Sequence, residues 1–213
     1  MPIPVFTHPD CLRHDPGPDH PETPARLRVL LDRARAEPAV EVRSATAAPL
    51  DALLAVHPRA YLDSLIAMSA RGGGALFLDT VVNEASWSAA LGAAGAVLAA
   101  VDHAHGGAGH AFAAVRPPGH HALASRAMGF YLVANAVIAA RHAQRLGRER
   151  VLIVDWDVHH GNGTQALMEH DETIRYISLH QHPWYPGTGM ADERGWGTCS
   201  TFLAAPASRP SCT

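Results

Sequence analysis

Residues 155–163 carry the side chains whose types and spacing best suit metal chemistry. Asp155, Asp157 and His159 occupy alternate positions after an apolar run, and in an extended chain residues two apart project to the same side. Asp157 and His159 therefore offer an oxygen and a nitrogen to one divalent metal such as zinc or ferrous iron. A chance polar cluster is the alternative, but a carboxylate buried at a strand end is costly unless it is paired or metal-bound.

A second segment, residues 116–121, places two adjacent histidines after a stiff turn. Two prolines and a glycine precede His120 and His121, and rigid turns of this kind fix side chains for function. Histidine is also the outlier of the composition, with 15 copies against 4 tyrosines and 5 phenylalanines. Taken alone, a surface loop with two neighbouring histidines is an equally good interpretation. The position of the turn in the fold must decide between them.

The elements around these segments alternate between strands and helices. Residues 151–154 form an apolar run without alternation, which is typical of a strand buried on both faces. Further strands are predicted at residues 5–6, 40–42, 111–115 and 173–179, and helices at 24–35, 61–68, 86–105 and 134–146. Ser86 is predicted to cap the third of these helices, and glycines 72–74 to form a loop.

This order predicts an α/β fold, a three-layer open parallel sheet with helices on both faces. In such sheets, functional residues gather on loops at the carboxyl ends of the strands. Residues 116–121 and 155–163 both follow predicted strands. We therefore expect the two segments to meet at one edge of the sheet.

Composition and charge argue against several classes of function. The formal net charge is −3 and no Lys/Arg-rich stripe is present, which argues against direct nucleic-acid binding. The most apolar stretch, residues 89–101, is too short and too rich in alanine and glycine to span a bilayer. The first residues lack a basic region followed by an apolar run, so no signal peptide is expected. Three cysteines without metal-binding spacing fit a reducing cytoplasm.

Residues 116–121 followed by residues 155–165 resemble the paired signatures of the histone deacetylase superfamily. Asn162 makes the second signature more similar to the class II and bacterial branch of histone deacetylase-like amidohydrolases and acetylpolyamine amidohydrolases. Three further stretches resemble that branch, residues 8–26, 128–135 and 178–189. The resemblance implies an arginase/deacetylase-like sheet. It also implies a zinc-dependent hydrolase that removes acetyl or other acyl groups from acetyl-lysine or acetylpolyamine-type amines.

The resemblance implies two metal sites. Asp157 and His159 would be two of three protein ligands of the catalytic zinc. A structural potassium ion would be held by the Asp155 carboxylate, the Ser178 hydroxyl and the backbone oxygens of Asp157, His159 and Leu179.

The resemblance also assigns catalytic and channel roles. His120 and His121 would be the tandem active-site histidines, with His121 as the general base. Asp155 would orient His120, and Asn162 would orient His121. The substrate channel would be formed by Gly129, Phe130 and Tyr185, with Arg26 lining the internal cavity beneath the metal.

The last part of the sequence departs from the family pattern, which has a third zinc ligand, an aspartate, and a late tyrosine that hydrogen-bonds the oxyanion. We find neither. Residues 1–197 are therefore predicted to be the N-terminal part of a single deacetylase domain, truncated and incomplete on its C-terminal side. Residues 198–213 are predicted to be an aberrant, disordered tail, which a frameshift or premature stop near residue 196 would explain. Impaired activity and an exposed apolar sheet edge are expected to follow.

Two other interpretations stay open. One is a non-catalytic remnant or a binding module for acylated amines. The other is an arginase-like hydrolase, although that family prefers a two-manganese site with more carboxylates than this sequence offers. In the leading interpretation the partner is an acetylated amine, with no nucleic acid and no membrane, and a homo-oligomer is left open.

Overall fold

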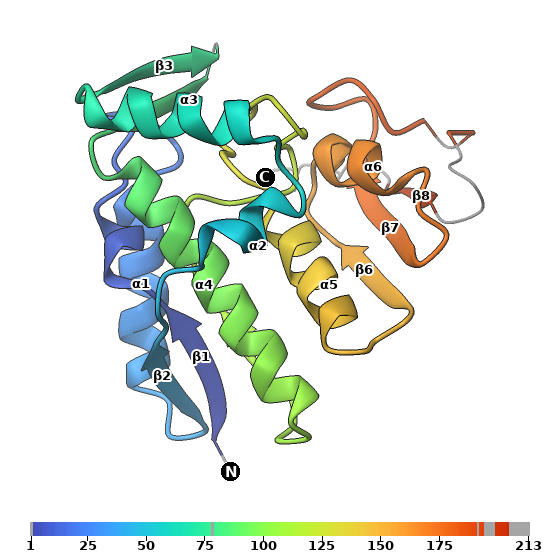
Figure 1. The fold of residues 1–213 in the computed structure, drawn as a ribbon, viewed down its shortest axis with the longest axis horizontal. Coiled ribbons are helices and arrows are strands. Elements are labelled where there is room, and N and C mark those ends of the chain that lie inside the picture. The colour runs from blue at the N-terminus through green and yellow to red at the C-terminus, as the bar shows by residue number, and fades with distance from the viewer. Residues whose placement is uncertain (1, 78, 191, 194–198, 205–213) are drawn as a thin grey trace, which may run out of the picture.

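The computed structural model describes residues 2–77, 79–190, 192–193 and 199–204. They form two three-stranded parallel sheets and a two-stranded hairpin with helices packed around them (Figure 1), which is the α/β class that the sequence predicts. In chain order the elements are β1 (Ile3–Thr7), a 3₁₀ helix (Pro9–Leu12), α1 (Pro24–Arg35), β2 (Val40–Ser44), α2 (Leu50–Leu54), α3 (Arg59–Ala70), β3 (Gly73–Phe77), β4 (Thr80–Asn83), α4 (Ser86–His105), β5 (Phe112–Ala113), α5 (Asn135–Arg145), β6 (Val151–Asp155), α6 (Asn162–Met168), β7 (Ile174–Gln181) and β8 (Cys199–Ala204).

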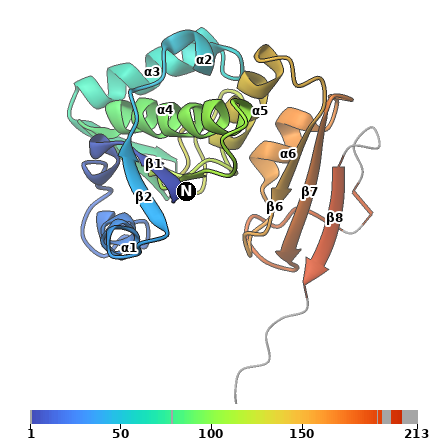
Figure 2. The ribbon, with the colours of Figure 1, turned by 90° about the horizontal axis from the view of Figure 1, so that it is seen from below.

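The first sheet has the strand order β2-β1-β5 and carries helices on both faces. β1 pairs in parallel with β2 along its whole length and with β5 over two residues. Leu27 and Leu31 of α1, Val5 of β1 and Ala93 of α4 share one buried cluster. Figure 2 shows α1 and α4 on opposite sides of β1 and β2. This half of the molecule has the three layers that the sequence predicts.

Local signals account for the bounds of the helices. Pro24 occupies the first turn of α1, and the Ala25 N–H donates to Thr23 Oγ1 at 3.1 Å, so both predicted start signals are used. Gly147 follows α5 with a φ of 93°, a conformation that favours glycine after a helix end. None of the described helices is both long and apolar enough to cross a membrane.

The predicted cap of α4 is wrong. Ala85 occupies the cap position and makes no side-chain hydrogen bond. Ser86 Oγ instead accepts from the Asn83 N–H at 2.7 Å, donates to Asn83 Oδ1 at 2.9 Å and lies 2.8 Å from His14 Nδ1. These contacts occupy the hydroxyl, so Ser86 joins three segments instead of closing a helix end.

The second sheet has the strand order β6-β7-β8, and all its strands run in parallel. α5 and α6 cover one face, where Val137, Met168 and Ile174 are buried together. On the other face Figure 2 shows no helix among the described residues. Leu152 and Val154 are accordingly 55% and 41% exposed, so the prediction that residues 151–154 are buried on both faces is wrong for these two side chains.

The glycine-rich stretch at residues 72–74 was predicted to be a loop, but Gly73 begins β3, which pairs antiparallel with β4. A Cβ at Gly73 would lie 2.2 Å from the carbonyl oxygen of Val82, so a glycine lets the two strands approach closely. Glycine in this stretch therefore allows the two strands of a β-hairpin to pack closely. α2 was also not predicted, because five residues are too few to show a helical period.

The expectation of a disordered tail is wrong for residues 199–204. Residues 199–204 form β8, which pairs in parallel with β7 over six positions. An open strand edge presents unpaired donors and acceptors, and a segment that supplies complementary backbone groups satisfies them. Residue 198 and residues 205–213 lie outside the described residues.

We expect Gly95→Ala in α4 to destabilise the protein, although alanine at an unhindered helix position usually stabilises it by about 1 kcal/mol. A Cβ at Gly95 would lie 1.9 Å from the carbonyl oxygen of Thr46, a contact that only a backbone shift can relieve. Overpacking of this kind costs about 1–3 kcal/mol, which chemical denaturation can measure. Gly106→Ala is the matched control, since its Cβ would meet its nearest neighbour at 3.4 Å; equal effects of the two substitutions would contradict this account.

Candidate active site

The turn at residues 116–121 brings His120 against the carboxyl end of β6. His120 Nδ1–H donates to Asp155 Oδ2 at 2.9 Å, and the Tyr176 hydroxyl on β7 donates to the same oxygen at 2.9 Å. The Thr164 N–H donates to the carbonyl oxygen of His120 at 3.0 Å, so α6 holds the turn from another side. A Cβ at Gly161 would lie 2.4 Å from Asp155 Oδ2, so glycine leaves room for this cluster.

These contacts set the charge of Asp155. Burial disfavours its carboxylate, but hydrogen bonds from His120, from the Asp157 N–H and from Tyr176 outweigh burial, so the pKa of Asp155 lies below its usual value. The carboxylate in turn fixes the proton of His120 on Nδ1. His120 Nε2 is buried and has no hydrogen-bond partner among the described residues.

His121 lies beside His120 but has a neutral partner. The ring centroids are 4.0 Å apart, and His121 Nδ1–H donates to Asn162 Oδ1 at 2.8 Å. Burial, and after it the charge of His120, lower the pKa of His121 to about 3. His121 is therefore a neutral imidazole whose Nε2 lone pair is free, which is the state that a general base requires.

The predicted metal ligands also converge. Asp157 Oδ1 lies 3.0 Å from His159 Nδ1, and the His121 and His159 ring centroids are 6.1 Å apart. They do so in a loop, so the expected extended strand through Asp155, Asp157 and His159 is wrong. β6 ends at Asp155 because the Asp157 N–H donates to the Asp155 carboxylate and the His159 N–H to the Asp157 carboxylate, which folds the chain into successive turns.

This oxygen and nitrogen pair fits part of a metal site. A divalent metal would replace the proton on His159 Nδ1 and leave a proton on Nε2. The Trp184 indole N–H now donates to that Nε2 at 3.1 Å, so metal binding requires the half-exposed Trp184 to move. Across the described residues, no group of three or more His, Cys, Asp or Glu side chains is placed to hold a metal. Asp157 and His159 therefore supply two of the ligands that such a metal needs.

A cavity of about 210 Å³ leads to the side chains of Asp157 and His159, here called the metal pair, and to the His121 ring. It is lined by Arg26, Asp79, Pro118, His121, Gly129, Phe130, Tyr131, Asp157, His159 and Tyr185. Gly129 has a φ of 60°, and a Cβ there would lie 2.6 Å from the His121 ring, so this wall needs a glycine. Phe130 also has a left-handed φ of 79°, and its N–H is held by Thr80 Oγ1 at 3.0 Å. Burial, together with Asp79, raises the pKa of Tyr185 to about 12, so this wall residue keeps its proton.

The remaining predicted site residues are less closely gathered. The Arg26 side chain is 64% exposed and lies at the cavity rim, 4.0 Å from Glu22, whereas the resemblance implied a position beneath the metal. Ser178 lies opposite Asp155 in the register of β6 and β7, and its Oγ is 2.8 Å from His180 Nδ1. Leu179 follows Ser178 on β7. The potassium site stays a prediction.

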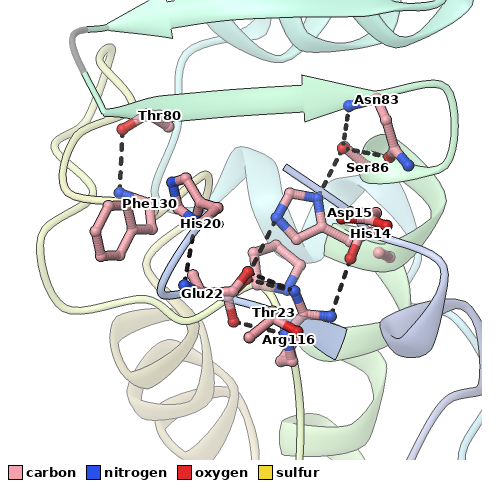
Figure 3. A network of polar contacts seen from close by, with 12 residues as sticks. His14, Asp15, His20, Glu22, Thr23, Thr80, Asn83, Ser86, Arg116 and Phe130 are labelled. Carbon is pink, nitrogen blue, oxygen red and sulfur yellow. Dashed lines mark hydrogen bonds and ion pairs between the residues drawn. The ribbon is translucent and has the colours of Figure 1, made fainter. Parts of the chain in front are cut away.

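A buried ion pair holds the start of the histidine turn (Figure 3). The Arg116 Nε–H donates to Glu22 Oε1 at 2.6 Å, and the two side chains are 4% and 1% exposed. Arg116 Nη1 also donates to the carbonyl oxygens of Cys11 and His14. Burial and the charge of Arg116 lower the pKa of His14 to about 4, so His14 stays neutral beside the pair. The N-terminal segment is thus fastened to the residue that begins the turn.

Sequence reasoning missed several residues of this site. Tyr131 lies 4.8 Å from both histidine rings, and Tyr176 is bonded to Asp155. Glu22 was noted only as part of a similar stretch. Tyr176 stands two residues before Ser178 on the strand beside Asp155, and this spacing could have shown that the two side chains share a face. No local signal pairs Glu22 with Arg116.

Known proteins resemble this chain in sequence and fold. Residues 20–209 match the family model described as the histone deacetylase domain. The chain is 46% identical to an uncharacterised protein of Synechocystis over 87% of its own length and 64% of that protein. It is 42% identical to a histone deacetylase-like amidohydrolase of Pseudomonas aeruginosa over 84% of its length and 49% of that protein. The chain therefore spans about half to two thirds of these relatives.

Two solved structures share the fold. The crystal structure of the HDA15 HD domain superposes with a TM-score of 0.88 at 37% identity and covers 94% of this chain and 61% of that chain. An acetylpolyamine aminohydrolase from Burkholderia pseudomallei superposes with a TM-score of 0.86 at 28% identity, covering 95% of this chain and 72% of that one.

We expect Arg116→Met to destabilise the protein by about 3–5 kcal/mol, because it leaves the Glu22 carboxylate buried without its partner. Adding Glu22→Gln to the same chain should recover part of that loss, since the uncompensated charge is gone. Arg59→Met is the matched control: Arg59 pairs with Asp63 at 2.8 Å on the surface, and exposed pairs contribute about 0–1 kcal/mol. Urea unfolding measures all three, and a similar loss for the two single variants would refute the anchoring role.

We also expect stability to fall as the pH drops from about 6.5 toward 4. The unfolded chain protonates His14 near its ordinary pKa, whereas the folded chain holds that pKa at about 4. One such group contributes up to about 1.4 kcal/mol per pH unit in this range. Thermal unfolding at pH 7 and pH 5 should show a smaller difference for His14→Gln than for the parent chain. The exposed His105→Gln should keep the parent difference, and a His14→Gln difference no smaller than that of the parent would contradict the assignment.

Proposed function

This chain belongs to the histone deacetylase family, and from that premise we propose that its site hydrolyses the amide bond of an acetylated amine with the help of zinc. The observation that carries the proposal is the pair of adjacent histidines with different partners. His120 donates to a carboxylate, whereas His121 donates to a neutral amide. Two neighbouring imidazoles in different electrostatic surroundings can divide acid and base roles between them.

His121 is the proposed general base. Its Nδ1–H is held by Asn162, so Nε2 accepts a proton from the attacking water and later returns one to the leaving amine. Asp157 and His159 would hold the zinc, which when bound polarises the amide carbonyl and lowers the pKa of a water molecule. Burial keeps His121 in the neutral form, with an unprotonated ring nitrogen, that a base needs.

His120 is proposed to stabilise negative charge. The negative charge of Asp155 lies against His120 Nδ1, and Nε2 is the atom proposed to face the reacting oxygen. A positive charge there would repel a proton from His121, in the direction of its lowered pKa.

The proposed substrates are acetyl-lysine side chains or acetylpolyamines. A relative is named a histone deacetylase-like amidohydrolase and a structural neighbour an acetylpolyamine aminohydrolase. Such substrates often carry positive charge, which suits a chain with a net charge of −3. A reducing cytoplasm and a structural potassium ion at Asp155, Ser178 and Leu179 complete the proposal.

A binding module for acylated amines is the second candidate. It is favoured by the metal pair, which provides two protein donors, with no third one beside them in the described part of the chain. Two protein ligands hold zinc less well than three, and a partly exposed site stabilises developing charge less than a dry one. We therefore expect weak deacetylase activity from these 213 residues.

Zinc binding and turnover test the proposal. We expect the purified chain to bind about one zinc ion, measured by calorimetry, and Asp157→Ala or His159→Ala to abolish binding. His121→Ala should keep the zinc but lower turnover of an acetyl-lysine peptide by about 10²-fold or more. His105→Ala, on the exposed end of α4, is the control and should change neither. Zinc binding without turnover would favour the binding module, and a chain that binds no zinc would overturn the proposed metal chemistry.

A further inference from the structure

Tyr131 lines the cavity of the candidate site but has no part in the proton transfers proposed above. Its ring centroid lies 4.8 Å from the ring centroids of both His120 and His121, tilted to the first ring and edge-on to the second. The same cavity, of about 210 Å³, leads to Asp157 and His159. A ring in this position meets any part of a ligand that passes beyond the His121 side chain.

Tyr131 is the inner tyrosine of this cavity, and Tyr185 is the outer one. Burial raises the pKa of Tyr131, and the charges of Asp157 and Asp155 raise it further, so its hydroxyl lies toward the metal pair and the end of β6. Tyr185 is 38% exposed, and the charge that raises its pKa after burial is that of Asp79, in the turn between β3 and β4. The two tyrosines therefore wall different depths of one cavity.

The backbone holds Tyr131 in place from both directions. Before it, the Tyr131 N–H donates to the carbonyl oxygen of Met128 at 3.0 Å, and the Met128 N–H donates to the carbonyl oxygen of Tyr131 at 3.1 Å. After it, Leu132 is 1% exposed, and its carbonyl oxygen accepts from the Tyr61 hydroxyl at 2.6 Å. A shift of this segment would break buried hydrogen bonds, each of which is costly to leave unmade. The ring is therefore a fixed wall.

The other large side chains of the cavity are less suited to close its inner end. The Arg26 side chain is 64% exposed, and Tyr185 is also partly in solvent, so both can change rotamer within picoseconds to nanoseconds. Phe130 packs edge-on against His20 at 4.7 Å (Figure 3). Tyr131 is the wall residue that packs on both histidines.

We propose that Tyr131 limits the length of the acyl group that the site accepts, so that an acetyl group fits and a chain several carbons longer does not. The cavity is smaller than the roughly 300–1,000 Å³ of ordinary small-molecule sites, which leaves little space beyond one narrow chain. Additional methylene groups would have to displace a ring that is packed against two imidazoles, and packed interiors resist such insertion. The inference rests on the proposed function, because it takes an acylated amine as the ligand.

Binding of two acylated peptides tests this proposal. The full 213-residue chain is titrated in EDTA with a peptide that carries acetyl-lysine and with the same peptide carrying octanoyl-lysine, so that neither zinc nor turnover enters the measurement. Calorimetry gives both affinities. We expect the parent chain to bind the acetyl peptide at least about tenfold more tightly. Tyr131→Ala should shift the ratio of the two affinities toward octanoyl by about tenfold or more, and Tyr131→Leu should shift it in the same direction by less.

Two control variants separate ring size and position from other effects. Tyr131→Phe keeps the ring and should keep the parent ratio within about twofold. Tyr185→Ala removes the same side chain from the outer part of the cavity, so it should change both affinities together and leave their ratio within about twofold. Circular dichroism shows whether each variant is folded, and Tyr131→Leu decides the outcome if the alanine variant unfolds.

Several results would overturn the limit set by Tyr131. They are a parent chain without preference for acetyl, a folded Tyr131→Ala or Tyr131→Leu variant with the parent ratio, and an equal shift in Tyr185→Ala. Acetyl-selective binding that Tyr131→Ala relaxes, in a chain that hydrolyses nothing when zinc is added, would support the limit and contradict the proposed hydrolysis. A folded chain that binds neither peptide would overturn both the limit and the proposed substrate class.

Discussion

The Asp155 carboxylate is the contact through which the two sheets share one site. It ends β6, accepts hydrogen bonds from Tyr176 on β7 and from His120, and receives the N–H of Asp157 in the next turn. His120 belongs to the turn that follows the first sheet. One buried charge therefore holds three segments, and its cost of burial is offset only while all of these donors stay in place. The space for this arrangement depends on Gly161, because any larger residue would meet the same oxygen.

The same carboxylate separates the two histidines chemically. His120 faces a negative charge and His121 faces the amide of Asn162, although the rings are in contact. In water, two adjacent imidazoles would titrate at similar pH, because nothing distinguishes them. Burial strengthens each local partner, so the carboxylate and the amide give the two rings different electrostatic surroundings. A buried Glu22–Arg116 pair then fixes where this turn begins, so position and protonation are set by separate groups.

The sequence contains enough to predict what lies along a strand or a helix, and little of what lies between them. α1 has its predicted bounds, because Thr23, Pro24 and the leucine spacing act within the helix itself. Asp157 and His159 could be paired because they are two residues apart, although hydrogen-bonded turns replaced the expected strand. The contacts of Ser86 and Glu22 could not be predicted from local spacing, because their partners lie 72 and 94 residues away. The exposed face of β6 could not be predicted either. An apolar run indicates that a strand favours burial, but it does not indicate which element covers it.

The exposure of the metal pair and the openness of β6 have the same physical origin. A site at the carboxyl end of a parallel strand is enclosed by the loops of the strands on both sides. β6 has a neighbouring strand on one side within the described residues, so Trp156 is left in solvent, and Asp157 and His159 keep partly exposed side chains. In this more solvent-exposed position, a charged side chain interacts more weakly with its partner than in a dry protein interior. His120 and His121, which the turn and α6 enclose, escape this weakening. The two histidines proposed for proton transfer are therefore enclosed by the described chain, whereas the proposed metal ligands Asp157 and His159 lie in its more exposed part.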